Sequence, residues 1–348
     1  MKLSRKKLIQ QLTADTQALA MPEGRRVGQP GHELALNYLR QRMAALELVP
    51  FKGDNYELCY ERPHPNTRTD QLYTNLVGVI PGKDRTLDPL LIGAHYDSVI
   101  DAPCADDNAT SVAMNLAIAE EFIGAGLERD LIIALFDAEE PPHFLSKSMG
   151  STRFYHDHCS DINFAGVIVT DLIGHDLSLS DLGVDIPKAD LLLPNAKKTV
   201  FVLGSESDPV FPEIVEECAE ATSGIKVFPT LNSYIGNMSD HHSFEVNGQP
   251  FLFLSCGQGR YYHHELDNLD WINFKKLAAI TEFVARVIHR LDKTPANAAS
   301  ELHDPIEFEL RMIKKLGGPT LPLLLKSFGI EMPKDREELN ALLGNLLP

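Results

Sequence analysis

The sequence has little cysteine and a deficit of positive charge. Its five cysteines are an odd number without a Cys-x-x-Cys pair, which favours a reducing compartment over a disulfide framework. Lysine and arginine total 32 against 49 aspartates and glutamates, so the formal net charge is -17. Because so acidic a surface repels phosphate backbones and anionic lipids, neither nucleic acids nor membrane surfaces are expected partners.

Long apolar runs are missing too. None approaches the ~18 residues that span a bilayer, and the amino-terminal residues lack the apolar core and cleavage site of a signal peptide. A Walker loop, a Rossmann glycine fingerprint and a Gly-x-Ser-x-Gly elbow are also absent. We therefore expect a cytoplasmic protein whose chemistry comes from other residues.

What is present is an ordinary globular composition, with 44% hydrophobic and 23% charged residues in a chain of 348. Short apolar runs predict buried strands at residues 75–80, 90–94, 131–136, 165–170, 200–203 and 251–255. Helical spacing is found at residues 4–20, 31–46, 108–124, 147–157, 209–221 and 272–290. This alternation predicts an α/β fold, with a mostly parallel central sheet covered by helices on both sides.

The pattern changes after about residue 292. Asp335 and Glu338 resemble a capping box, and an apolar helical stripe follows, formed by Leu339, Leu342, Leu343, Leu346 and Leu347. We expect a catalytic domain over residues 1–292 and a helical C-terminal extension over residues 293–348. The extension would pack on the main domain or join two copies in a homo-oligomer. Residues 172–198 lack a clear period and are expected to form an irregular insertion.

Acidic and histidine residues follow four of the predicted strands. The strand at 90–94 leads to His95 and Asp97, the strand at 131–136 to Glu139 and Glu140, the strand at 165–170 to Asp171, and the strand at 251–255 to His263. The carboxyl ends of strands form the ligand crevice of open α/β sheets, so these side chains are expected at one rim.

Taken singly, each motif has a simpler explanation. His95 and Asp97 could be a metal ligand with an orienting carboxylate, or a capping pair. Asp107 beside Asp106 could bridge two metal ions, or the pair could only begin a helix. Glu139 and Glu140 could divide proton transfer and metal binding between them, or form an exposed acidic loop. Together, the oxygen and nitrogen donors suit Zn²⁺, with Mn²⁺ or Co²⁺ as substitutes.

In this order the motifs resemble the co-catalytic di-zinc aminopeptidases of peptidase family M28, which also contains glutaminyl cyclases and glutamate carboxypeptidases. The resemblance covers about residues 30–290 and implies a mixed β-sheet sandwiched by helices. It implies two zinc ions bridged by Asp107, with one held by His95 and Asp171 and the other by Glu140 and His263. Cys104 stands where the family usually has glycine, and residues 141–149 depart from its shortest loops, which leaves the turn geometry and the specificity open.

The resemblance also implies roles beside the metals. Glu139 would be the general base, Asp97 the partner of His95, and Asp240, His241 and Tyr262 would lie near the substrate. The expected function is hydrolysis of a peptide or aminoacyl substrate by a metal-bound hydroxide. Two alternatives remain, a single-zinc acyltransferase like glutaminyl cyclase and an inactive binding module on the same fold. Tyr262, where the cyclases are expected to have tryptophan, favours the peptidases.

Overall fold

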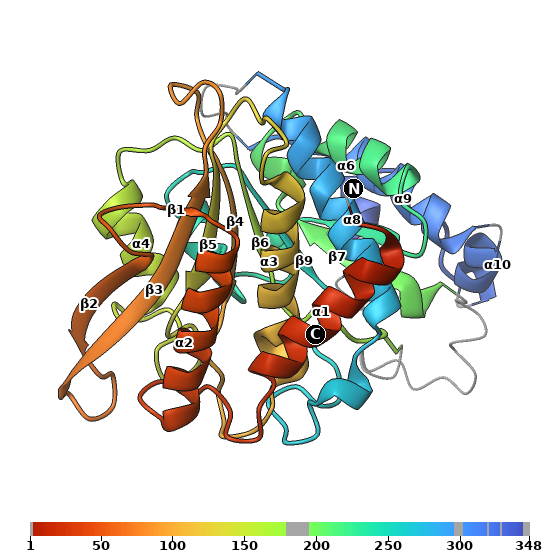
Figure 1. Ribbon diagram of the computed structural model, residues 1–348. Helices are drawn as coiled ribbons and strands as arrows, with labels where there is room; N and C mark the ends of the chain where they lie inside the picture. Colours follow the sequence, from red (N-terminus) through yellow and green to blue (C-terminus); the bar gives the residue numbers. More distant parts are fainter. Residues whose placement is uncertain (1–2, 179–194, 296–301, 319, 328, 344–348) are drawn as a thin grey trace.

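A nine-stranded mixed β-sheet forms the centre of the molecule (Figure 1). The computed structural model describes residues 3–178, 195–295, 302–318, 320–327 and 329–343. The strands are β1 (Val49–Pro50), β2 (Glu57–Pro63), β3 (Asp70–Ile80), β4 (Leu90–His95), β5 (Leu131–Phe136), β6 (Gly166–Thr170), β7 (Thr199–Leu203), β8 (Lys226–Thr230) and β9 (Phe251–Ser255).

The strand order is β1-β3-β5-β4-β6-β9-β7-β8, and β2 also pairs with β3. Neighbours are parallel through the middle of the sheet, from β5 across β4 and β6 to β9, and again between β7 and β8. Strand β3 is antiparallel to β1, β2 and β5, and β7 is antiparallel to β9. The four central strands therefore end at the same edge, as the sequence predicted.

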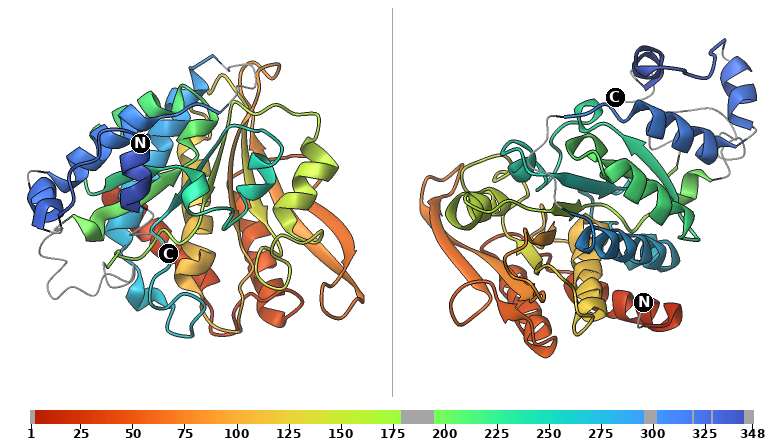
Figure 2. Two further views of the ribbon diagram at one scale, coloured as in Figure 1. Left: turned by 180° about the vertical axis from the view of Figure 1, so that it is seen from behind. Right: turned by 90° about the horizontal axis from the view of Figure 1, so that it is seen from above.

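Helices cover both faces of the sheet, which confirms the predicted sandwich. One face carries α1 (Arg5–Leu19), α2 (Pro30–Ala45), α3 (Thr110–Phe122), α6 (Phe211–Glu220) and α8 (Phe274–Asp292). The right-hand view of Figure 2 shows α1, α2, α3 and α8 together on that side. The other face carries α4 (Gly150–Phe154), a π-helical turn (Tyr155–Cys159) and α7 (His242–Glu245).

The strands alternate between these two layers. In β4, for example, Ile92 and Ala94 pack with α3 and α8, whereas Leu91 packs with the aromatic residues of the opposite layer. Successive side chains of a strand point to opposite faces, so a strand with apolar residues at every position is buried on both. This explains why unbroken apolar runs marked the central strands in the sequence.

The C-terminal helices are α9 (Ile306–Gly317), α10 (Thr320–Ser327) and α11 (Arg336–Leu343). Helix α9 packs on β8 and α6 at one end of the sheet, and α10 packs on α9 (Figures 1 and 2). Ile313, Leu339 and Leu343 form a small core there with Phe228 of β8, and the Asp335 carboxylate caps α11 by accepting the Glu338 N–H at 2.9 Å. Leu346 and Leu347 of the predicted stripe, and residues 179–194 of the predicted insertion, lie outside the described residues.

The division at residue 292 coincides with the end of α8, but two separate domains and a homo-oligomer both stay predictions. Among the helices that the structure describes, none is both long and apolar enough to cross a membrane.

Candidate metal centre

The predicted metal ligands meet at the carboxyl edge of the four central strands. His95 is the last residue of β4, Glu140 lies in the loop after β5, Asp171 directly follows β6, and His263 lies in the loop after β9. Asp107 comes from an irregular turn (Ala105–Ala109) that leads into α3. The structure therefore brings all five side chains together from separate parts of the chain.

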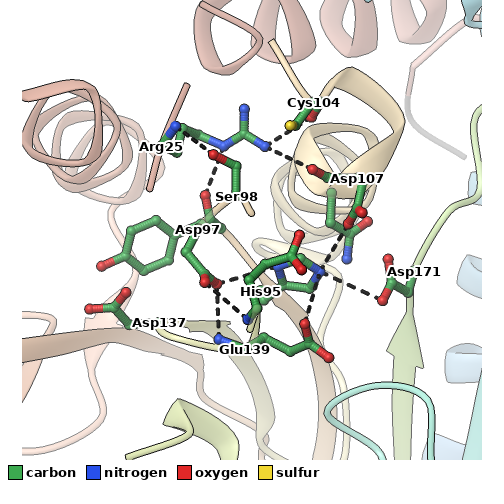
Figure 3. A network of polar contacts seen from close by, with 12 residues as sticks. Arg25, His95, Asp97, Ser98, Cys104, Asp107, Asp137, Glu139 and Asp171 are labelled. Atoms are coloured by element: carbon green, nitrogen blue, oxygen red, sulfur yellow. Dashed lines mark hydrogen bonds and ion pairs between the residues drawn. The ribbon is translucent and has the colours of Figure 1, made fainter. Parts of the chain in front are cut away.

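The carboxylate of Asp107 lies between two groups of donors. Its Oδ1 atom is 3.5 Å from His95 Nε2, and its Oδ2 atom is 3.3 Å from His263 Nε2. His95 Nε2 also lies 3.6 Å from Asp171 Oδ2 (Figure 3), and His263 Nε2 lies 3.2 Å from Glu140 Oε2. Two donor groups thus share one carboxylate, and each of its oxygens faces a different histidine.

Several of these donor atoms are buried without a hydrogen-bond partner among the described residues. They are His95 Nε2, Asp107 Oδ2, Glu140 Oε1, Asp171 Oδ1 and His263 Nε2. Donor atoms of His95, Asp107 and Glu140 lie within 4.8 Å of one another. Buried polar atoms are nearly always paired, so unpaired nitrogen and oxygen donors at this spacing fit a metal ion, and this set of donors suits zinc.

The pKa values of acidic and histidine side chains at the centre are shifted, as expected where carboxylates are crowded together. Burial raises the pKa of Glu140 to about 8, and the nearby Asp107 adds to the rise. Burial also raises the pKa of Glu139 well above its ordinary value, with a contribution from Glu140. For His263, burial opposes protonation, but Asp107 and Glu140 outweigh it and raise the pKa to about 10. A bound cation would relieve this repulsion between the carboxylates.

The Asp97 carboxylate links His95, at the end of β4, to the loop after β5 that carries Glu139 and Glu140 (Figure 3). Its Oδ1 atom lies 3.3 Å from His95 Nδ1 and accepts the Glu139 N–H at 3.0 Å, and its Oδ2 atom accepts the Glu140 N–H at 3.1 Å. Burial tends to raise the pKa of Asp97, but His95 and the two amides lower it overall. The sequence suggested that Asp97 orients His95 alone. In the structure its carboxylate also orients the backbone of Glu139 and Glu140.

Two acidic residues without a predicted role fix the turn that carries Asp107. The Asp267 carboxylate accepts the Asp106 N–H at 2.9 Å and the Asp107 N–H at 3.0 Å. Asp106 faces away from the donors, where its carboxylate accepts the Gly174 N–H and contacts His175 Nδ1, both at 2.5 Å. Asp267 lies four residues after His263, so the loop that carries one donor also holds the turn that carries another.

Arg25 is a further residue that the sequence did not reveal. Its buried guanidinium donates to the carbonyl of Tyr96 at 2.8 Å, beside His95, and to those of Cys104 at 2.9 Å and Asp107 at 3.2 Å (Figure 3). It therefore ties the end of β4 to the turn that carries Asp107. Because its acceptors are backbone carbonyls, no particular partner side chain is required, and the sequence holds no signal for the contact.

A cleft of about 510 Å³ opens above the donors. Asp107, Glu139, Glu140 and Asp171 line it on one side. Its other walls are mostly apolar and include Phe144, Leu172, Phe201, Leu203, Tyr234, Ile235, Met238, Phe253 and Tyr262. The arrangement places a polar floor of possible metal ligands beneath a pocket suited to an apolar group.

The three predicted substrate residues occupy different positions. Tyr262 lines the cleft. Asp240 is fully buried, and burial raises its pKa to about 7. His241 stacks on Phe253 with ring centroids 4.1 Å apart, and burial lowers its pKa to about 3. His241 thus supports the cleft wall from behind.

Comparison with known proteins finds relatives by sequence and by fold. The family model described as "Peptidase family M28" matches residues 75–288, more than half of the chain. An uncharacterized Escherichia coli protein, YfbL, is 25% identical over 233 residues, which are 62% of this chain and 71% of that protein.

Two solved structures from Bacteroides thetaiotaomicron share the fold. A leucine aminopeptidase precursor matches with a TM-score of 0.63 and 16% identity, over 81% of this chain and 96% of that chain. A glutaminyl cyclase bound to N-acetylhistamine matches with a TM-score of 0.62 and 16% identity, over 81% of this chain and 97% of that chain. At identities this low, the matches show a shared fold and not a shared activity. The length of the family match decides the classification, and this chain belongs to peptidase family M28.

Proposed function

We propose that this protein is an aminopeptidase that uses two zinc ions to hydrolyse the amino-terminal peptide bond of its substrate. The observation that carries the proposal is the position of Asp107, whose two oxygens face His95 and His263 separately. A carboxylate shared in this way is the arrangement that two adjacent cations require.

In this proposal His95 and Asp171 hold one ion, and Glu140 and His263 hold the other, with Asp107 common to both. When bound, zinc supplies Lewis acidity, which lowers the pKa of water and polarises the scissile carbonyl. The net negative charge of the donors offsets most of the charge of two dications, so the pair can be held in a buried site.

Glu139 is proposed as the group that moves the proton. It lines the cleft beside the donors, its Oε2 atom lies 3.9 Å from His95 Nε2, and the Asp97 carboxylate fixes its backbone N–H. Glu139 would accept a proton from the attacking water and deliver it to the leaving amine. A carboxyl group in this position can gain and lose a proton during the reaction, which is the part of a general base.

The walls of the cleft support an apolar substrate. Phe144, Phe201 and Met238 present large apolar side chains next to the acidic floor. A leucine- or phenylalanine-like side chain at the substrate's amino-terminal residue would bury apolar area there, at roughly 25 cal/mol for each Å². The proposed substrates are therefore peptides or aminoacyl compounds that begin with an apolar residue.

The decisive experiment is metal analysis followed by a panel of aminoacyl substrates with and without chelator. We expect two zinc ions per chain, cleavage fastest for apolar amino-terminal residues, and loss of activity with chelator that added zinc restores. Zinc-loaded protein that cleaves none of the panel would reject the proposal, and a test for pyroglutamate formation would then separate the cyclase from the inactive binding module. The predicted cytoplasmic location needs a separate fractionation experiment.

A glutaminyl cyclase activity is the alternative that the fold comparison raises, because the two Bacteroides structures match this chain about equally well. It predicts one zinc ion per chain and pyroglutamate formation from peptides that begin with glutamine. The shared position of Asp107 supports the peptidase instead, because a single ion has no need of a carboxylate that faces two histidines.

A further inference from the structure

One wall of the cleft comes from the segment between β8 and α7, residues 231–238. Tyr234, Ile235 and Met238 of this segment line the cleft. Ile235 and Met238 are 37% and 43% exposed, so neither is held by close packing in the free protein. The segment contains a short 3-10 turn (Asn232–Tyr234) and no regular pairing with the sheet. Its position must therefore come from contacts made by a few side chains.

The hydroxyl of Tyr234 is held by the C-terminal extension. Arg336 Nη1 donates to it at 2.8 Å, and the hydroxyl itself donates to Asn340 Oδ1. Both partners belong to α11, more than 100 residues further along the chain. The ring of Tyr234 packs against the small core of Ile313, Leu339 and Leu343. One tyrosine thus contacts the substrate cleft and the C-terminal helices at once.

Arg336 is itself anchored on the side away from the cleft. Its guanidinium pairs with Asp304 and with Glu309 of α9, whose side chain is completely buried. The base of the segment is tied to the extension as well, because Glu206 accepts the Asn232 N–H at 2.7 Å through its side chain and the His303 N–H at 3.1 Å through its carbonyl. Both ends of the 3-10 turn are therefore linked to the C-terminal extension.

We infer that the C-terminal helices are part of the substrate site, because α11 fixes Tyr234 and thereby the apolar wall of the cleft. This inference rests on the proposed function. A wall that is already fixed does not have to be ordered when substrate binds, which favours affinity. Tyr234 is not among the metal donors, so the extension acts on binding of the apolar substrate group and leaves the chemical step unchanged.

Tyr234→Phe tests this inference with little disturbance, because it removes the hydroxyl and keeps the ring in the wall. We expect faster amide hydrogen exchange in residues 231–238. For an apolar aminoacyl substrate, KM should rise roughly three- to tenfold, because the wall that loses these two hydrogen bonds must then be ordered when substrate binds. The kcat and the zinc content should stay close to those of the native protein. Asn340→Ala removes one of the two partners from α11 and should give a smaller change in the same direction.

Tyr56→Phe is the matched control. The Tyr56 hydroxyl is hydrogen-bonded too, in this case to the Leu48 carbonyl at 2.8 Å, but it does not line the cleft. This variant should change neither exchange in residues 231–238 nor KM. The inference is overturned if Tyr234→Phe leaves exchange unchanged, or if exchange rises while KM does not. If the native protein cleaves no substrate, the proposed function fails separately, and exchange alone decides whether α11 holds the wall.

Discussion

Replacing Asp97 by asparagine tests whether one buried carboxylate organises the metal centre. Asp97 faces three donors, namely His95 Nδ1 and the N–H groups of Glu139 and Glu140, at 3.0 to 3.3 Å. An asparagine side chain has the same shape but a single acceptor oxygen, and its NH₂ group would face at least one of these donors. The Asp97→Asn variant therefore loses at least one hydrogen bond to a charged acceptor.

The expected loss of zinc affinity in Asp97→Asn follows from the hydrogen bond that this variant loses. A hydrogen bond to a charged group contributes about 1.5–3 kcal/mol, which corresponds to roughly 10- to 150-fold in an equilibrium constant. Changing a residue that orients metal ligands typically lowers metal affinity or activity by about 10- to 100-fold. The two estimates overlap, so we expect zinc affinity to fall by about 10- to 100-fold.

The measurement is a zinc titration against a competing chelator of known affinity, followed by kinetics at saturating zinc. Asp101→Asn is the control, because Asp101 lies four residues away and forms an exposed ion pair with Arg26, at 2.6 Å. Exposed pairs contribute about 0–1 kcal/mol, so this variant should bind zinc normally. Zinc affinity within twofold of native in Asp97→Asn, with the fold intact, would refute the role assigned to the carboxylate.

Three further predictions concern the same site. Glu139→Gln should lower kcat by about 10²- to 10⁴-fold while the bound zinc is retained, and near-native activity would exclude Glu139 as the proton acceptor. His263→Ala should reduce the zinc content towards one ion per chain, whereas an unchanged stoichiometry in metal analysis would count against a two-ion site. Removing zinc with a chelator should lower the melting temperature in calorimetry, because ligands that bind only the native state stabilise it, and equal melting temperatures would argue against a native metal site.

The sequence predicted the central part of the fold because those strands are buried on both faces. Their apolar runs are visible without knowledge of the partners, and β4, β5, β6 and β9 all appeared close to their observed bounds. Strand β2 was missed because Leu58 is its one buried residue, and its other positions are half-buried or exposed. Strand β8 pairs with β7 at the other edge. It contains Pro229 and an exposed Lys226, so it lacks the unbroken apolar run by which the central strands were recognised.

Residues whose partners are side chains or metals were easier to find than residues whose partners are backbone atoms. The candidate donors were visible because histidine and carboxylate side chains suit a metal, and several of them follow predicted strands. Asp267 and Arg25 instead act on backbone groups of the turn that carries Asp107. Any residue type presents the same N–H and C=O groups there, so only the folded structure reveals these contacts.

Cys104 shows how such contacts preserve the site when the local sequence departs from the family pattern. Its φ and ψ angles are 43° and 58°, in the left-handed region that favours glycine. That conformation costs an L-residue roughly 1–2 kcal/mol. Arg25 holds the Cys104 carbonyl at 2.9 Å, and the Asp267 carbonyl accepts the following Ala105 N–H at 3.1 Å. Each such hydrogen bond contributes about 0.5–3 kcal/mol. Together they hold the backbone in this conformation in spite of the strain, and Asp107 keeps its position.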